Sequence, residues 1–238
     1  EMLRSLVGSE MCIRDSIKGA ELVVYSAAIK ETNPERQAAK ELGIPCIERS
    51  VMLGIVTRRY RRSIAVSGTH GKTTTTALLG KIMSDAEDSV FVVGNIGTPY
   101  TSKALEMKDS STTVAEISSF QLETIHEFHP EISAILNITP DHLNRHHTME
   151  CYIRTKEAIT TNQTNDEVCV LNYEDEVLRA FGESAPVHVV WFSSARKLAE
   201  GFYLDGEEIF YAHDGSTEKV INVNDLNLLG RHNYENVM

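Results

Sequence analysis

The stretch Ser63–Thr76, with the sequence SIAVSGTHGKTTTT, is an apolar run followed by a glycine-containing turn, a lysine and four threonines. This order predicts a strand, a tight loop and the first turn of a helix. Gly68 and Gly71 let the backbone approach a phosphate closely, and the helix N-terminus adds a partial positive charge. We expect Lys72 to reach the β- and γ-phosphates of a nucleoside triphosphate and the Thr73 hydroxyl to bind Mg²⁺. The stretch therefore predicts a phosphate-binding loop.

One position of this loop departs from the common phosphate-loop pattern. That pattern has a glycine at the position of Val66, whereas here Gly68 takes the tight turn nearer the lysine. The alternative is an ordinary strand-to-helix turn with an incidental lysine, but the strand, glycines, lysine and threonine all agree with phosphate binding. The nucleotide-binding residues predicted in the loop are Gly68, Thr69, His70, Gly71, Lys72, Thr73 and Thr74. Such a loop indicates only that a nucleoside triphosphate is bound, so the chemistry must come from other residues.

Short apolar runs and helical patterns alternate from Glu21 onward, at the spacing typical of βαβ units. Strands are expected at 22–26, 63–66, 90–93, 112–115, 134–137, 168–171 and 187–191. Helices are expected at 33–42, 72–83, 101–108, 119–126, 149–161 and 174–181. This order predicts an α/β fold with a mostly parallel sheet covered by helices on both faces. An Asp-Gly pair within 202–212 predicts a hairpin that adds an antiparallel edge.

Polar residues follow two of the predicted strands, at the edge where open parallel sheets bind ligands. Glu116 ends one strand, and its carboxylate is suited to Mg²⁺. Asp141 and His142 follow the next strand, and His142 is a candidate metal ligand or phosphate contact. Each residue also has an ordinary interpretation: a solvated strand end for Glu116, a turn cap for Asp141, and an exposed or structural histidine for His142.

Two further segments face the same edge. Gly94–Pro99 (GNIGTP) follows a strand and is typical of a turn that lets the backbone and the Asn95 amide approach a ligand, although by itself it indicates only a turn. Lys156 lies on a predicted helix, where the local pattern alone would make it a surface lysine.

The composition excludes several classes of protein. With 238 residues, of which 42% are hydrophobic, the chain can bury a substantial core. Its 23 basic and 34 acidic residues give a formal charge of −11, which argues against nucleic acid or anionic lipid as a partner. No apolar run is long enough to span a bilayer, and we expect a cytoplasmic protein without membrane insertion. Four widely spaced cysteines without a CxxC pair indicate reduced thiols.

The two ends of the chain look unnatural. Residues 1–16 (EMLRSLVGSEMCIRDS) have no periodicity leading into the next segment and resemble a translated sequencing adapter, so we leave them out of the fold prediction. The chain stops at Met238, directly after a predicted helix start. We therefore expect a fragment of a longer protein.

Six motifs, taken together, resemble those of the Mur ligases, the ATP-dependent enzymes that form amide bonds in peptidoglycan precursors. They occur in the family's order: Gly68–Thr73 (GTHGKT), Gly94–Pro99 (GNIGTP), Glu116–Glu123 (EISSFQLE), Ile135–Arg145 (ILNITPDHLNR), Lys156, and Gly230–Asn236 (GRHNYEN). The resemblance implies three segments: non-native residues 1–16, a partial Rossmann-like domain for the uridine nucleotide at 17–61, and a central ATP-binding domain at 62–238. The family's C-terminal domain would be missing, and we expect the chain alone to have little or no turnover. A monomer is expected.

The resemblance also implies roles for single residues. Lys72 and the loop amides would bind the phosphates of ATP, and Thr73 and Glu116 would hold Mg²⁺. His142 would ligate a second Mg²⁺ together with Lys156, whose amine would be carbamylated to a carboxylate; Lys72, His142 and Lys156 are thus the predicted catalytic residues. The predicted contacts to the acceptor substrate are Asn95 and Ser118, and those to adenine are Asn233 and Asn236. In the family, ATP converts the substrate carboxylate to an acyl phosphate, which the amine of the amino acid attacks.

Two branches of the family compete for this chain. SSFQLE and GNIGTP resemble the branch that adds D-glutamate to UDP-N-acetylmuramoyl-L-alanine, which is the favoured prediction. Residues 17–76, with His70 in the loop, resemble the branch that adds L-alanine to UDP-N-acetylmuramate. We therefore expect that two genes are joined within Gly68–Gly80, with a genuine divergent ligase as the alternative. A non-catalytic nucleotide-binding module is a third hypothesis.

Overall fold

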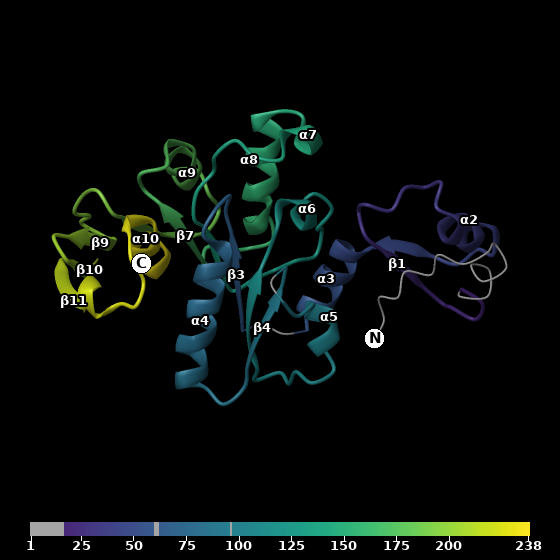
Figure 1. The fold of residues 1–238 in the computed structure, drawn as a ribbon, viewed down its shortest axis with the longest axis horizontal. Coiled ribbons are helices and arrows are strands. Elements are labelled where there is room, and N and C mark those ends of the chain that lie inside the picture. Colours follow the sequence, from purple (N-terminus) through teal and green to yellow (C-terminus); the bar gives the residue numbers. More distant parts are fainter. Residues whose placement is uncertain (1–16, 60–61, 96) are drawn as a thin grey trace.

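The computed structural model describes residues 17–59, 62–95 and 97–238, and its centre is the predicted strand, loop and helix. Strand β3 (Ser63–Ser67) runs into helix α4 (Lys72–Ala86), which lies alongside it in Figure 1. On either side of β3 lie β5 (Thr112–Glu116) and β6 (Ile132–Ile135), both parallel to it. Val66 is opposite Glu116 on one side and Ala134 on the other. The carboxyl ends of the three strands therefore meet at one edge, as predicted.

The main sheet has nine strands in the order β11-β10-β9-β8-β7-β6-β3-β5-β4. The remaining strands are β4 (Val90–Gly94), β7 (Val168–Asn172), β8 (His188–Ser193), β9 (Gly201–Asp205), β10 (Glu208–His213) and β11 (Ser216–Asn222). All pairings from β4 to β9 are parallel, which confirms the predicted α/β fold. The predicted strand at 134–137 lies two residues earlier, at 132–135, and β11 was not predicted.

The predicted hairpin forms the antiparallel edge of the sheet. β9 pairs with β10, and β10 pairs with β11, both in antiparallel fashion. Asp205 pairs with Glu208, so the two loop residues are Gly206 and Glu207 rather than an Asp-Gly pair. Gly206 has a φ of +62°, a conformation that glycine adopts without strain.

Helices cover the sheet, although two are shorter than predicted. Their bounds are α5 (Tyr100–Lys103), α6 (Ser119–Leu122), α7 (Leu143–His146), α8 (Met149–Glu157), α9 (Glu176–Gly182) and α10 (Arg231–Val237), with 3₁₀ turns η1 (Ala158–Thr160) and η2 (Val223–Asp225). The expected helices at 101–108 and 119–126 form only one turn each. At α6 a capping box between Ser118 and Gln121 starts the helix.

A smaller unit precedes the main sheet and lies at the opposite end of the molecule from β9–β11 (Figure 1). In it β1 (Val23–Tyr25) pairs in parallel with β2 (Cys46–Glu48), and α2 (Pro34–Glu41) begins at the N-cap Asn33. This is the part expected to be the remnant of a Rossmann-like domain, and the boundary between 61 and 62 stays a prediction. The unpredicted helix α3 (Arg49–Thr57) leads from it to the main sheet and contacts α5 and α6.

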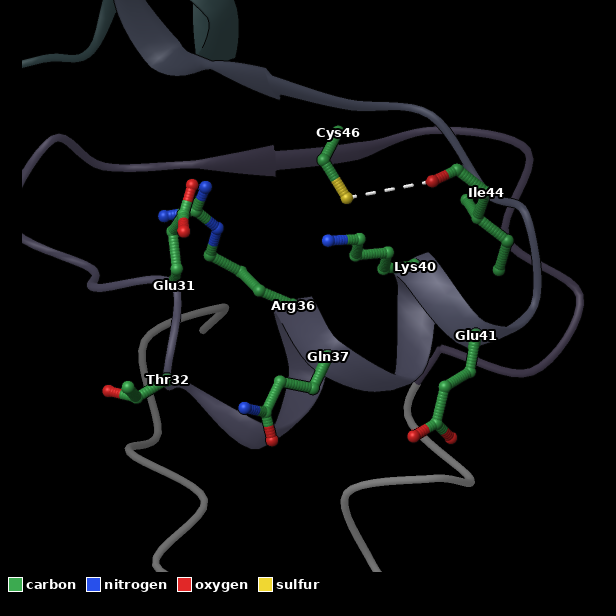
Figure 2. A pocket seen from close by; sticks show the side chains of 8 residues that line it. All are labelled: Glu31, Thr32, Arg36, Gln37, Lys40, Glu41, Ile44 and Cys46. Carbon is green, nitrogen blue, oxygen red and sulfur yellow. Dashed lines mark hydrogen bonds between the residues drawn. The ribbon is translucent and has the colours of Figure 1, made fainter.

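A hollow of about 790 Å³ lies beside α2 (Figure 2). Its lining includes the acidic side chains of Glu31 and Glu41 and the basic side chains of Arg36 and Lys40. Cys46 Sγ donates to the carbonyl oxygen of Ile44 at 3.6 Å. None of the predicted site residues lines it.

The core lies between the main sheet and its helices. Its fully buried members include Ile117, Ile135, Ile159, Cys169 and Leu171. Burial raises the pKa of the Cys169 thiol to about 12, so this cysteine packs as an apolar side chain. In the part of the chain that the structure describes, no helix has the length and apolarity needed to cross a bilayer.

Candidate functional site

The phosphate loop takes the conformation that its glycines predict. Gly68 has a φ of +142°, and Gly71, the N-cap of α4, has a φ of +85°. A Cβ on Gly68 would lie 3.1 Å from Leu136 Cβ, and one on Gly71 would lie 2.2 Å from Asn236 Oδ1. The first turn of a helix leaves its backbone amides without helical partners, so the start of α4 presents donors to an anion. The geometry is that of an anion-binding cradle.

Two lysines converge on this loop. Lys72 Nζ donates to the carbonyl oxygens of Gly68 at 2.9 Å and Thr69 at 2.8 Å. Lys156, from α8, donates to the same Gly68 oxygen at 2.8 Å and is only 1% exposed. Burial, and then the charge of Lys72, lower the pKa of Lys156 to about 7. The charge of Asp141 acts in the opposite direction and raises this pKa. Lys156 is therefore not the surface lysine that its local sequence alone suggests.

Glu116 lies directly beside the start of α4. Its carboxylate is 3% exposed and accepts a hydrogen bond from Thr73 Oγ1 at 2.7 Å and one from Asn95 Nδ2 at 3.0 Å. The turn after β4 is closed by Gly94, whose Cβ, if present, would lie 2.3 Å from the Glu116 carbonyl oxygen. Hydroxyl and carboxylate oxygens are ligands that Mg²⁺ prefers, so Thr73 and Glu116 fit a magnesium ion.

A second loop, after β6, is tied to the phosphate loop. Asn137 exchanges two hydrogen bonds with the backbone of His70, at 2.8 and 3.1 Å. Asp175, the N-cap of α9, accepts the amide hydrogen of Ile138 at 2.7 Å. These contacts hold the loop that carries Asp141 and His142, and neither Asn137 nor Asp175 was among the predicted site residues.

His142 and the predicted acceptor contacts share one cavity. It has a volume of about 350 Å³ and lies between the two units, where it is lined by Ser26, Ala28, Arg49, Asn95, Ser118 and His142, among others. His142 adopts a left-handed conformation with a φ of +52°, and its ring centroid lies 4.9 Å from that of Phe120. The structure thus brings Asn95, Ser118 and His142 together.

The predicted adenine contacts lie on α10, which packs against α4. Asn233 and Asn236 line a cavity of about 210 Å³ together with Gly71 and Thr74. Thr75 Oγ1 donates to the Asn236 carbonyl oxygen at 3.3 Å. Thr75 and Asn236, which are 161 positions apart in the sequence, are therefore neighbours near the N-terminus of α4.

The predicted metal ligands form one oxygen pair but no larger cluster. Within 17–59, 62–95 and 97–238, no group of three or more His, Cys, Asp or Glu side chains is arranged to hold a metal ion. The second metal position, predicted at His142 and a carbamylated Lys156, stays a prediction.

One buried residue of the site was missed at the level of sequence. Tyr152 is 1% exposed and contacts both the phosphate loop and Lys156. The signal for it was present, because residues four apart on a helix face the same side, and Tyr152 precedes Lys156 by four.

Two models of known protein families match this sequence. A model described as Mur ligase middle domain matches residues 66–238, which is more than half of the chain, and one described as Mur ligase family, catalytic domain matches residues 8–61. The chain belongs to the Mur ligase family. The second match begins within the first 16 residues, which were expected to be non-native and lie outside the described residues.

Curated members of the Mur ligase family are similar to most of the chain. A UDP-N-acetylmuramoylalanine–D-glutamate ligase of Lachnospira eligens is 52% identical over 221 residues, which is 91% of this chain and 48% of that protein. The chain thus spans about half the length of the curated relatives it matches. The 221 matched residues exceed the 171 of segment 68–238, so this D-glutamate ligase is also similar to residues upstream of the loop. No junction of two genes within Gly68–Gly80 is needed to explain the chain.

Solved structures of Mur ligases share the fold. The UDP-N-acetylmuramate:L-alanyl-gamma-D-glutamyl-meso-diaminopimelate ligase from Neisseria meningitides has a TM-score of 0.69 at 17% identity, covering 94% of this chain and 74% of that one. The MurF ligase from Thermotoga maritima, solved in complex with ADP, has a TM-score of 0.56 at 16% identity, covering 91% of this chain and 57% of that one.

Proposed function

We propose that this chain carries the ATP-binding part of a ligase that adds D-glutamate to UDP-N-acetylmuramoyl-L-alanine, in the cytoplasmic synthesis of peptidoglycan precursors. The observation that carries the proposal is the pairing of Thr73 and Glu116 at 2.7 Å at the mouth of the phosphate loop. The name of the Lachnospira eligens relative supports D-glutamate as the amino acid, and the ADP complex of MurF supports an adenine nucleotide.

Each residue of the loop has a defined task in this proposal. The amides at the start of α4 bind the phosphates, and Lys72 turns from the loop carbonyls toward the β- and γ-phosphates. Burial lowers the pKa of Lys72, but the charges of Glu116 and Asp141 oppose this shift and favour the ammonium form that neutralises phosphate charge. Asn233 and Asn236 contact the base from α10.

Thr73 and Glu116 would hold Mg²⁺, and His142 and carbamylated Lys156 a second ion. When bound, magnesium neutralises charge that develops on the transferred phosphate. Asn95 keeps the Glu116 carboxylate oriented through its amide at 3.0 Å. The low pKa of Lys156 supplies the neutral amine that carbamylation requires.

The acceptor would lie in the cavity lined by Asn95, Ser118 and His142. Its carboxylate is phosphorylated by ATP, with ADP leaving, and the amine of D-glutamate then displaces phosphate from the acyl phosphate. Ser118 and Asn95 would orient the acceptor at the carboxyl edge of the sheet, beside the phosphate loop.

Isothermal titration calorimetry with ADP tests the nucleotide site on this chain. We expect saturable binding that weakens about 10-fold or more in Lys72→Ala, because a charge-assisted contact to phosphate is lost. Lys81→Ala is the matched control, since Lys81 lies on the same helix but is exposed and paired with Asp85. Absence of ADP binding, or equal weakening in the control, would contradict the proposal.

Turnover is to be measured in a protein of the curated relatives' full length that contains this sequence. Phosphate release that requires UDP-N-acetylmuramoyl-L-alanine and D-glutamate supports the proposal. Release that requires UDP-N-acetylmuramate and L-alanine assigns the other branch. Nucleotide binding without release, unchanged in Lys156→Ala and His142→Ala, assigns a non-catalytic module.

A further inference from the structure

Tyr152 lies on α8, one helical turn before Lys156, and is fully enclosed. The Lys156 amine lies over its ring, with Nζ 4.8 Å from the ring centroid. The ring also packs against that of His146, at 5.0 Å between centroids. The ring packs against the buried amine in either protonation state and attracts it more strongly when it is protonated, so the ring restrains the place of the Lys156 amine.

The hydroxyl of Tyr152 contacts the phosphate loop. Its oxygen lies 3.1 Å from Thr69 Oγ1. Thr69 Oγ1 also donates to the carbonyl oxygen of Thr139 at 3.2 Å and accepts from the Thr139 amide at 3.0 Å. A threonine hydroxyl has a single hydrogen, which the Thr139 carbonyl receives, so Tyr152 must be the donor to Thr69.

One helix therefore holds two consecutive residues of the loop. Lys156 donates to Gly68, and Tyr152 donates to Thr69, from positions four apart on α8. Thr69 in turn joins the phosphate loop to the loop of Thr139. Tyr152 therefore contacts the buried amine with its ring and the phosphate loop with its hydroxyl, and through Thr69 it is connected to the loop after β6.

We propose that Tyr152 is a positioning residue of the ligase reaction, a role that rests on the proposed function of this loop. Its hydroxyl sets the backbone at Thr69, and its ring sets the amine of Lys156. It lines neither the cavity of Asn95, Ser118 and His142 nor that of Asn233 and Asn236, and it acts through these two residues.

The affinity for ADP tests the role of the Tyr152 hydroxyl separately from that of the Tyr152 ring. Tyr152→Phe keeps the ring but leaves Thr69 without its donor, and we expect the Kd for ADP to rise about 3- to 10-fold, the effect of one lost hydrogen bond. Tyr100→Phe is the matched control, because Tyr100 is also buried and donates to a threonine hydroxyl, that of Thr113, at 3.4 Å. Tyr100→Phe should lower the free energy of unfolding but leave the Kd for ADP unchanged.

A double-mutant cycle tests whether the hydroxyl acts through Thr69. We expect Tyr152→Phe and Thr69→Val to be strongly non-additive, both in the Kd for ADP and in the free energy of unfolding. Additive effects would overturn the proposal. It would also be overturned if Tyr152→Phe lost stability but bound ADP as the wild type does, since the hydroxyl would then be structural only.

Nuclear magnetic resonance tests the ring without nucleotide. In protein labelled with ¹³C-lysine, the Lys156 Cε signal, assigned by its loss in Lys156→Met, should carry a ring-current shift that persists in Tyr152→Phe and disappears in Tyr152→Leu. An unchanged signal in Tyr152→Leu would overturn the role of the ring. If the wild type does not bind ADP, the proposed function fails. The Lys156 signal and the double-mutant cycle measured by unfolding still test the contacts of Tyr152 in that case.

Steady-state kinetics of the full-length enzyme also distinguish the role of the Tyr152 hydroxyl from that of its ring. Tyr152→Phe should raise the KM for ATP more than it lowers kcat, because it loosens the loop. Tyr152→Leu should lower kcat about 10-fold further, because it also releases Lys156. Equal effects of the two variants on kcat would overturn the assignment of the ring to Lys156.

Discussion

The side chains of Lys72 and Lys156 share one acceptor, because both amines donate to the carbonyl oxygen of Gly68, at 2.9 and 2.8 Å. Two ammonium groups beside a single oxygen repel each other, and Lys72 is the second cause, after burial, of the lowered pKa of Lys156. Lys156 thus has little tendency to keep its proton at the place where the proposed reaction needs a neutral amine.

The stability of the protein should depend on pH through Lys156. Its pKa falls from the ordinary 10.5 to about 7 on folding, so between these values the unfolded chain binds a proton that the folded chain does not. The free energy of unfolding should therefore rise with pH in this window, by at most about 1.4 kcal/mol per unit from this group. Urea denaturation at pH 7, 8 and 9 should show a shallower rise in Lys156→Met. Equal slopes in both proteins would contradict the assignment.

The magnesium dependence of nucleotide binding should come from Glu116. Glu116→Gln keeps the size of the side chain but removes its charge, so we expect ADP affinity to fall about 10-fold with Mg²⁺ and to change little with EDTA. Glu87→Gln is the control, since Glu87 lies at the other end of α4 and pairs with Arg62. A loss of equal size with EDTA would show that Glu116 acts without the metal.

Replacing Gly71 by alanine should reduce stability and ADP affinity more than the same change at a glycine that no other residue crowds. Gly71→Ala places a Cβ 2.2 Å from Asn236 Oδ1 at a φ of +85°. Gly215→Ala has a similar φ of +71° but meets no atom within 4 Å, so it isolates the backbone strain of about 1–2 kcal/mol. We expect Gly71→Ala to destabilise the protein beyond this control and to weaken ADP binding in calorimetry. Identical losses would mean that Asn236 moves aside freely.

The cysteines should differ in reactivity. Cys169 is fully buried with a pKa of about 12, whereas Cys151 is exposed on α8. Thiolate is the reactive form, so iodoacetamide at pH 8 should modify Cys151 and leave Cys169 unmodified until the protein unfolds. Peptide mass spectrometry measures both. Early modification of Cys169 would indicate that the core around β7 opens readily.

Much of the fold followed from local sequence. The apolar run at 63–67 and the glycines after it predicted β3, the loop and α4, because strand preference and positive φ are properties of single residues and their neighbours. The single-turn helices α5 and α6 were overestimated, since a short helix depends on what it packs against. The helix α3 was missed for the same reason.

The candidate site was predicted in part. Thr73 and Asn95 both donate to Glu116, because Glu116 ends one strand, Asn95 follows the neighbouring strand, and parallel order places such ends at one edge. Asn137, Asp175 and Tyr152 were missed, because their contacts reach residues between 37 and 83 positions away.

The sequence by itself determined the alternation of strands and helices, the phosphate loop and the family of this protein, since these depend on residue type and spacing along the chain. Only the tertiary structure decided the environment of each polar side chain. It buried Lys156, placed its amine beside that of Lys72 on the Gly68 oxygen, and brought α10 onto the start of α4. The physical reason is that burial and charge act through space, so the pKa of a lysine depends on neighbours that its own segment does not contain.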